Sequence, residues 1–119
     1  MIDPIVKKAL EIGIRQFERV ATRSVAASPD SIERMADSML VRATELLMES
    51  KLAAAREKGR GGWWDKEVCT LDYLRGLLKE HIEKGDLVDV INLAAMVTVR
   101  EIMEEIHSHN VERIKNASS

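Results

Sequence analysis

Gly59-Arg60-Gly61-Gly62-Trp63-Trp64-Asp65 is the stretch that decides how this chain folds, because it interrupts a sequence that otherwise has the period of amphipathic helices. Its glycines allow the backbone to turn sharply. Large apolar rings in such a turn either close a hydrophobic core or provide a binding surface. Adjacent side chains in a loop seldom point the same way, so we expect one tryptophan ring to be buried and the other to be at least partly exposed.

Composition places the chain among soluble globular proteins. Its 119 residues are 45% hydrophobic and 32% charged, which is enough apolar sequence for one domain with a core of its own. The single cysteine, Cys69, excludes an intrachain disulfide. The N-terminus lacks the apolar segment of a signal peptide, and the longest apolar stretch, Leu87 to Val99, is too short and too polar to span a bilayer. We therefore expect a cytoplasmic protein without membrane contact.

Hydrophobic periodicity and end signals predict an all-α, four-helix bundle-like fold in one domain, residues 1–119. The expected helices cover residues 4–24, 31–58, 71–84 and 87–115, with the Gly/Trp loop at 59–69. The second helix is expected to follow a break at Val25-Ala26-Ala27-Ser28-Pro29. The expected N-caps are Asp3, Asp30, Thr70 and Asp86, and Lys84-Gly85 ends the third helix.

Two of these helices are long for a globular protein, which predicts a homodimer. The second helix carries an apolar stripe over about 28 residues, and helices of that length usually have a partner along their whole length. The fourth helix is apolar nearly all round between Leu87 and Val99, so we expect it to be central and buried. The tail Asn116-Ala117-Ser118-Ser119 is expected to fray.

Acidic residues gather at the turn between the third and fourth helices, in the pairs Glu80/Glu83 and Asp86/Asp89. Each pair shares a helix face, so together they could hold Mg2+. Helix capping is the simpler explanation, because Asp86 is a good N-cap and Asp89 suits a first helical turn. Asn92 follows on the same face within an apolar run, and we expect it to be a hydrogen-bonded polar residue of the core.

The histidines do not have the spacing of a helical metal site. His107 and His109 are two residues apart, whereas a metal pair on one helix face needs three or four. Glu105 and His109 have that spacing but form a common exposed pair, and His81 beside Glu80 is equally ordinary. We therefore expect no metal and no cofactor.

Part of the chain resembles a known module. Gly62-Trp63-Trp64-Asp65, then Cys69, Leu74 to Leu78, and finally the run from Glu80 to Leu93 with Met96 look like a segment of small bacteriophage and prophage accessory proteins. In those proteins a Gly-Trp-Trp/His-Asp stretch precedes a helix, a His-x-x-Lys-Gly-Asp/Asn turn and an Asp-Val-Ala-Asn-type helix. The resemblance covers about the last half of the chain up to Arg100. It implies a phage or prophage origin and a host cytoplasm, without naming an activity.

A weaker resemblance concerns the helix from Asp86 to Met96. It is similar to the second metal-binding helix of the MazG-like all-α nucleoside triphosphate pyrophosphohydrolases, whose Glu-x-x-Asp pattern maps onto Asp86 and Asp89, with Asn92 next. Those enzymes also need a Glu-x-x-Glu pair on the preceding helix. Here Glu45 and Glu49 stand four apart, one residue out of register. The resemblance implies, as an alternative, a Mg2+-dependent enzyme or an inactive relative using Glu45, Glu49, Asp86 and Asp89.

The leading interpretation is a non-catalytic interaction protein whose partner is another protein. Its expected binding residues are Arg60, Trp63, Trp64 and Asp65, on a rigid helical scaffold that has no complete catalytic set. A third interpretation is a nucleic-acid binder that uses Arg56, Lys58 and Arg60 beside the tryptophans. The nearby acids Glu57, Asp65 and Glu67 and the net charge of −2 argue against it.

Overall fold

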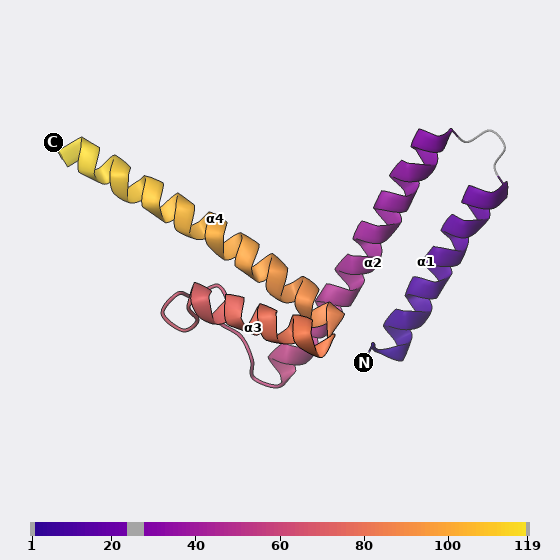
Figure 1. The fold of residues 1–119 in the computed structure, drawn as a ribbon, viewed down its shortest axis with the longest axis horizontal. Helices are drawn as coiled ribbons and strands as arrows, with labels where there is room; N and C mark the ends of the chain where they lie inside the picture. The colour runs from indigo at the N-terminus through magenta and orange to yellow at the C-terminus, as the bar shows by residue number, and fades with distance from the viewer. Residues whose placement is uncertain (1, 24–27, 119) are drawn as a thin grey trace. The chain divides into compact units, whose positions relative to one another are not determined.

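The computed structural model describes residues 2–23 and 28–118, and within them the chain is all-α. Its four helices are α1 (Pro4–Arg23), α2 (Pro29–Glu57), α3 (Leu71–Lys84) and α4 (Leu87–Ser118), as Figure 1 shows. No strand occurs in the described part of the chain. The predicted fold class is thus confirmed. The chain gathers into two compact units, Met1–Ala54 and Ala55–Ser119, which we call unit 1 and unit 2.

None of the helices in the described residues combines the length and the apolar character that a membrane span requires.

The start of α1 was predicted correctly, whereas the start of α2 was not. The Asp3 carboxylate accepts the N–H of Ile5 at 2.8 Å, which is the expected N-cap. In α2 the cap is Ser28, whose hydroxyl accepts the N–H of Ser31 at 3.1 Å. The helix therefore begins at Pro29, a position that suits proline because its missing N–H would have no helical partner. Asp30 lies inside the first turn and pairs with Arg34 at 2.9 Å. Residues 25–27 of the predicted break lie outside the described residues.

The ends of α3 follow the sequence signals closely. The Thr70 hydroxyl accepts the N–H of Tyr73 at 3.1 Å, and Gly85 ends the helix with a φ of 75°. A positive φ is open to glycine at no steric cost, so this turn depends on that residue. Helix α4 runs to Ser118, three residues beyond the predicted end at 115, so the expected fraying of the tail does not begin at Asn116.

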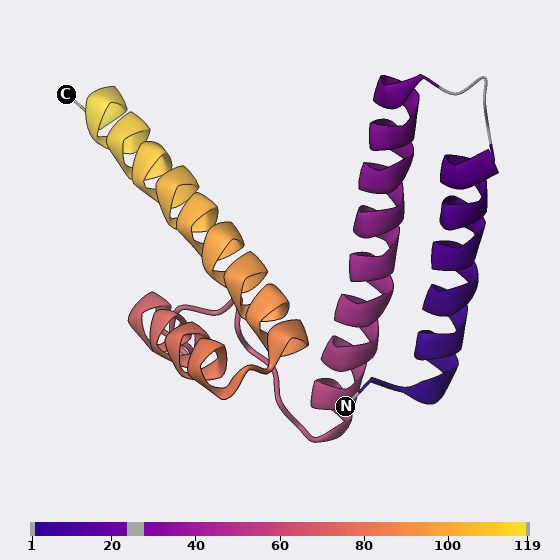
Figure 2. The same ribbon diagram turned by 45° about the vertical axis from the view of Figure 1, so that its right-hand side comes forward.

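Unit 1 is a helical hairpin without a core. Helix α1 and the part of α2 that belongs to this unit lie side by side and antiparallel (Figure 1 and Figure 2). No described side chain of unit 1 is buried. Between the helices runs an open groove of about 550 Å3, whose apolar lining includes Leu10, Phe17, Met35 and Met39. Apolar side chains of the two helices therefore line the same groove but remain accessible to solvent.

Unit 2 has a small core, formed between α3 and α4. Leu74 is 2% exposed, and Leu93 and Val97 are each 8% exposed. Trp63, Cys69 and four further apolar residues of the two helices pack around these three. The expectation that α4 is central and buried holds for one face of the helix only, because Leu87 is 70% exposed and Val99 is 42% exposed. Only one face of α4 reaches the core, which leaves the other apolar face in solvent.

Candidate functional site

The Gly/Trp loop is an ordered turn that joins α2 to α3 within unit 2. Gly62 has a φ of 81°, and a Cβ atom built on it would lie 2.9 Å from a methyl carbon of Val68, so only glycine fits. Asp65 organises the next turn. Its carboxylate accepts the N–H of Glu67 at 3.0 Å, and its carbonyl oxygen accepts the N–H of Cys69 at 2.8 Å. These bonds fix the backbone on both sides of the tryptophans.

A buried arginine of α4 holds this loop against the helices. Arg100 is 1% exposed, and its Nη1 donates to the carbonyl oxygens of Trp63 and Cys69, both at 2.7 Å. Its Nη2 has no hydrogen-bond partner among the described residues and lies 3.8 Å from a carboxylate oxygen of Glu104, whose side chain is half exposed. A buried guanidinium needs such partners, because an uncompensated charge in the interior costs several kcal/mol, on the order of 3–5. The loop carbonyls therefore serve as its main partners.

The two tryptophans differ in the expected direction, although Trp63 is only partly buried. Trp63 is partly buried and packs against the core formed by Leu74, Leu93 and Val97. Trp64 is 57% exposed. Two more apolar side chains of the same segment are also in solvent, Val68 at 70% and Tyr73 at 60%. The loop and the first turn of α3 thus expose three large apolar side chains within ten residues of sequence.

The four residues predicted to bind a partner have different positions. Arg60 and Trp64 are exposed, whereas Trp63 faces the core and the Asp65 carboxylate is used within the turn. Of the four, Arg60 and Trp64 have the most exposed side chains. Arg56 and Lys58, named for the nucleic-acid alternative, are also exposed.

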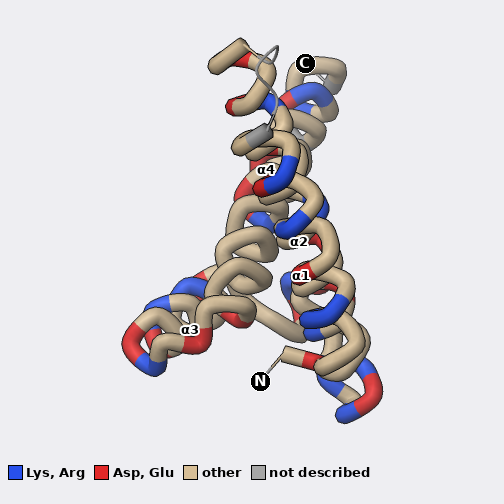
Figure 3. Tube along the Cα trace, turned by 90° about the vertical axis from the view of Figure 1, so that its right-hand side faces the viewer, with Lys and Arg blue, Asp and Glu red and all other residues tan. Residues whose placement is uncertain are grey.

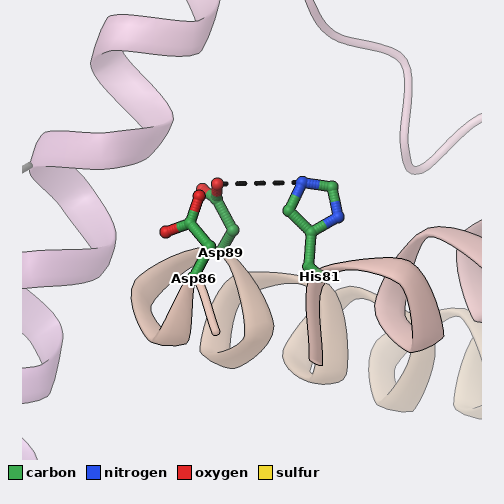
Figure 4. A group of neighbouring side chains, drawn as sticks. All are labelled: His81, Asp86 and Asp89. Atoms are coloured by element: carbon green, nitrogen blue, oxygen red, sulfur yellow. Dashed lines mark ion pairs between the residues drawn. The ribbon is translucent and has the colours of Figure 1, made fainter. Parts of the chain in front are cut away.

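A second cluster lies at the turn between α3 and α4. One ligand atom each from His81, Asp86 and Asp89 lies within 4.8 Å of the others, and all three side chains are partly buried. Figure 4 shows them projecting from the same side of the hairpin, with the His81 Nε2 3.8 Å from a carboxylate oxygen of Asp89. Asp86 immediately precedes α4, and its carbonyl oxygen accepts the N–H of Val90 at 3.0 Å, as expected of an N-cap.

The other acids considered from the sequence are elsewhere. Glu80 pairs with Lys84 at 2.9 Å on the exposed side of α3. The hydrogen bond from Lys84 holds the pKa of the Glu80 carboxyl below its usual range and raises the pKa of Lys84. Glu45 and Glu49 are exposed residues of unit 1, whereas Asp86 and Asp89 belong to unit 2. Asn92 is 5% exposed, which confirms its expected burial, but its Oδ1 has no hydrogen-bond partner among the described residues.

Sequence reasoning missed two residues, His81 and Arg100. His81 was set aside because only its neighbour in sequence, Glu80, was considered. The available signal was the spacing around Gly85, since a tight helical turn folds the last turn of α3 back over the first turn of α4. Arg100 was given no role from the sequence. No local pattern indicated that it bonds to carbonyls 31 and 37 residues earlier. His107, His109 and Glu105 are exposed and belong to no such cluster in the described residues.

Comparison with protein-family models, with curated proteins and with solved structures finds no match.

We predict that Arg100→Met lowers the free energy of unfolding by about 2–4 kcal/mol, because two loop carbonyls lose a charged donor and are left in a dry environment. Urea denaturation followed by circular dichroism measures this. Arg75→Met is the matched control. Arg75 forms its ion pairs with Asp72 and Glu101 on the half-exposed surface of the same unit, so its loss is expected to cost less than about 1 kcal/mol. Equal effects of the two substitutions would contradict a special role for Arg100.

Proposed function

We propose that this chain is a non-catalytic interaction protein that binds a partner protein through the apolar surface of Trp64, Val68 and Tyr73, and that self-associates through unit 1. The observation that carries the first part is the exposure of Trp64, at 57%, next to a tryptophan that is fixed to the core. Exposed tryptophan is uncommon on a soluble surface and is among the residues that dominate binding energy at protein interfaces.

The rigidity of the loop supports this proposal. Association costs free energy for every side chain and loop that must be ordered, so a preordered surface binds more tightly than a flexible one of the same composition. Here the backbone on both sides of Trp64 is already held, by Arg100 through the Trp63 carbonyl and by the Asp65 turn. A partner that covers Trp64 would have little left to order. The resemblance to phage proteins suggests a phage or bacterial protein as that partner.

The charges near the loop favour a protein partner over nucleic acid. Arg60 and Lys66 are interleaved with Asp65 and Glu67, and unit 2 as a whole has more acidic than basic residues. Figure 3 shows basic and acidic residues interleaved along α1 and α2 as well. Nucleic acid is recognised first through a continuous basic surface, which this distribution does not supply.

We predict that Trp64→Ala abolishes partner binding while the protein stays folded. A photo-crosslinking amino acid at position 64 should capture a specific protein in a bacterial lysate, and the isolated partner should bind the Trp64→Ala variant at least about 30-fold more weakly, a loss of about 2 kcal/mol.

The matched control is Ile106→Ala, since Ile106 is a large apolar side chain exposed to nearly the same degree, 54%, on α4. It should retain full affinity. If both variants bind equally well, Trp64 is not the anchor. If Trp64→Ala unfolds, the tryptophan serves the fold, and the proposal is wrong.

The self-association part rests on the unclosed groove of unit 1. Helices as long as α1 and α2 owe most of their stability to packing of an apolar face, and this hairpin buries no described side chain. The groove follows α1 from Leu10 to Val20 and α2 from Ser31 to Ala43, which is about three turns of each helix. That length suits another helical hairpin, because two such hairpins make a four-helix bundle with short connections.

Charge supports a second copy of the chain as the occupant. Residues 1–54 contain eight Lys and Arg and eight Asp and Glu, so unit 1 is formally neutral. Two identical neutral surfaces with interleaved charges meet without net repulsion, and a twofold dimer brings the same groove from each copy into one interface. A strongly charged partner would find no complementary surface along this groove.

We predict that the wild-type chain sediments as a dimer at micromolar concentration and that Phe17→Glu converts it to a monomer, because Phe17 lines the groove and its replacement would bury a charge in the interface. Val41→Glu is the control. Val41 is 64% exposed on α2 and does not line the groove, so this variant should remain a dimer. A wild-type monomer, or equal effects of both substitutions, would remove the basis of this part of the proposal.

A further inference from the structure

The cluster of His81, Asp86 and Asp89 is formed by residues from both sides of the Gly85 turn. His81 lies in the last turn of α3, Asp86 just before α4, and Asp89 in the first turn of α4. The ligand atoms lie within 4.8 Å of one another and the side chains point to the same side of the hairpin (Figure 4). The cluster is separate from the tryptophan surface and takes no part in the proposed function.

The imidazole of His81 is held in the orientation of a metal ligand. Its Nδ1 lies 2.8 Å from the carbonyl oxygen of Leu77. A carbonyl only accepts, so Nδ1 carries the proton and donates to it, and in the neutral ring Nε2 has a free lone pair. That lone pair is on the side of the Asp89 carboxylate. Histidines that bind metals almost always donate their other ring N–H in this way, to a backbone carbonyl or a carboxylate.

The distance between the two groups also suits a cation. The His81 Nε2 and the Asp89 oxygen are 3.8 Å apart, which is too long for a hydrogen bond between them. Two ligand atoms that each lie about 2.1 Å from a tetrahedral ion are roughly 3.4 Å apart. The His81 Nε2 and the Asp89 oxygen would therefore have to approach each other by only a few tenths of an ångström to bind one ion.

Asn92 provides an independent observation. It lies one turn after Asp89 on the same face of α4, is 5% exposed, and has an Oδ1 without a hydrogen-bond partner among the described residues. A buried amide oxygen normally has a donor. A water molecule held by a metal ion on this face of α4 would be such a donor.

The ligand set selects the class of ion. One imidazole nitrogen and two carboxylate oxygens suit Zn2+ and its neighbours Mn2+, Fe2+, Co2+ and Ni2+, whereas Mg2+ and Ca2+ prefer oxygen ligands alone. Two carboxylates also balance the charge of a divalent ion. Glu80 does not complete the set, because it pairs with Lys84.

We propose that His81, Asp86 and Asp89 bind one divalent transition-metal ion, which clamps the α3–α4 turn and keeps at least one coordination position for water. Metal binding at this turn would be independent of the tryptophan loop and of self-association. The expected stoichiometry is one ion per chain.

Co2+ titration of the metal-free full-length chain tests the proposal, with visible absorption and calorimetry as readouts. The variants are His81→Gln, Asp86→Asn and Asp89→Asn, each close to the original side chain in size. Asn caps a helix about as well as Asp, so Asp86→Asn keeps the N-cap while it removes the charge. Equal melting temperatures of all variants and wild type in EDTA establish that the fold is intact.

The wild type is expected to bind one Co2+ with micromolar affinity and to melt at a higher temperature with the metal bound. Zn2+ should displace the bound Co2+, whereas millimolar Mg2+ should not. Each ligand variant should bind at least about tenfold more weakly. The double variant His107→Gln/His109→Gln is the control and should bind as the wild type does. The proposal is wrong if the wild type does not bind Co2+, or if His81→Gln binds it as tightly as the wild type does. It is also wrong if only the control variant loses binding.

Discussion

The buried guanidinium of Arg100 is the constraint on which unit 2 depends. Arg100 is 1% exposed, so water does not solvate its guanidinium. The carboxylate of Glu104 lies 3.8 Å away and is half exposed. The carbonyl oxygens of Trp63 and Cys69, at 2.7 Å, therefore provide most of the compensation. Both carbonyls belong to the Gly/Trp loop. The loop must lie against α4 for the charge to be tolerated, and in this position the Trp63 ring packs against the core while Trp64 stays in solvent.

The parts of the fold that local chemistry controls were predictable. Asp3, Thr70 and Gly85 carry signals that act over a few residues, and the structure uses all three as expected. The cap of α2 was assigned to Asp30 although Ser28 precedes a proline that fits the first helical position, so two competing local signals were ranked wrongly. The apolar run from Leu87 to Val99 gave the right helix but the wrong degree of burial, because only one face has a partner.

The candidate sites were less predictable, since they depend on contacts between distant residues. Arg100 was given no role, because the sequence does not show which backbone carbonyls its guanidinium will contact. His81 became notable only once the Gly85 turn had brought it next to Asp86 and Asp89. The different exposure of the two tryptophans could be predicted, because adjacent side chains in a loop seldom point the same way. Which of the two rings packs inward could not, because it depends on how the loop lies against α3 and α4, and this contact joins residues far apart in sequence.

The two units differ in how far their own side chains stabilise them. Unit 2 encloses three buried apolar residues and a bonded arginine, whereas unit 1 has an open groove and no buried side chain in its described part. A binding event that occurs only in the folded state adds stability in proportion to ligand concentration and affinity. Self-association at unit 1, a partner at Trp64 and a metal at His81 would each act in this way. Each proposed interaction would therefore raise the free energy of unfolding of the unit that takes part in it.

Amide hydrogen exchange at the loop tests the central role of Arg100 most directly. In the wild type, the N–H groups of Asp65, Val68 and Cys69, which bond to carbonyls within the loop, should exchange slowly. In Arg100→Gln these three should approach the rate of an unfolded peptide, while amides in the middle of α3 keep their protection. Slow exchange of the loop amides in both proteins would show that the loop holds its shape without the guanidinium, and would contradict the account.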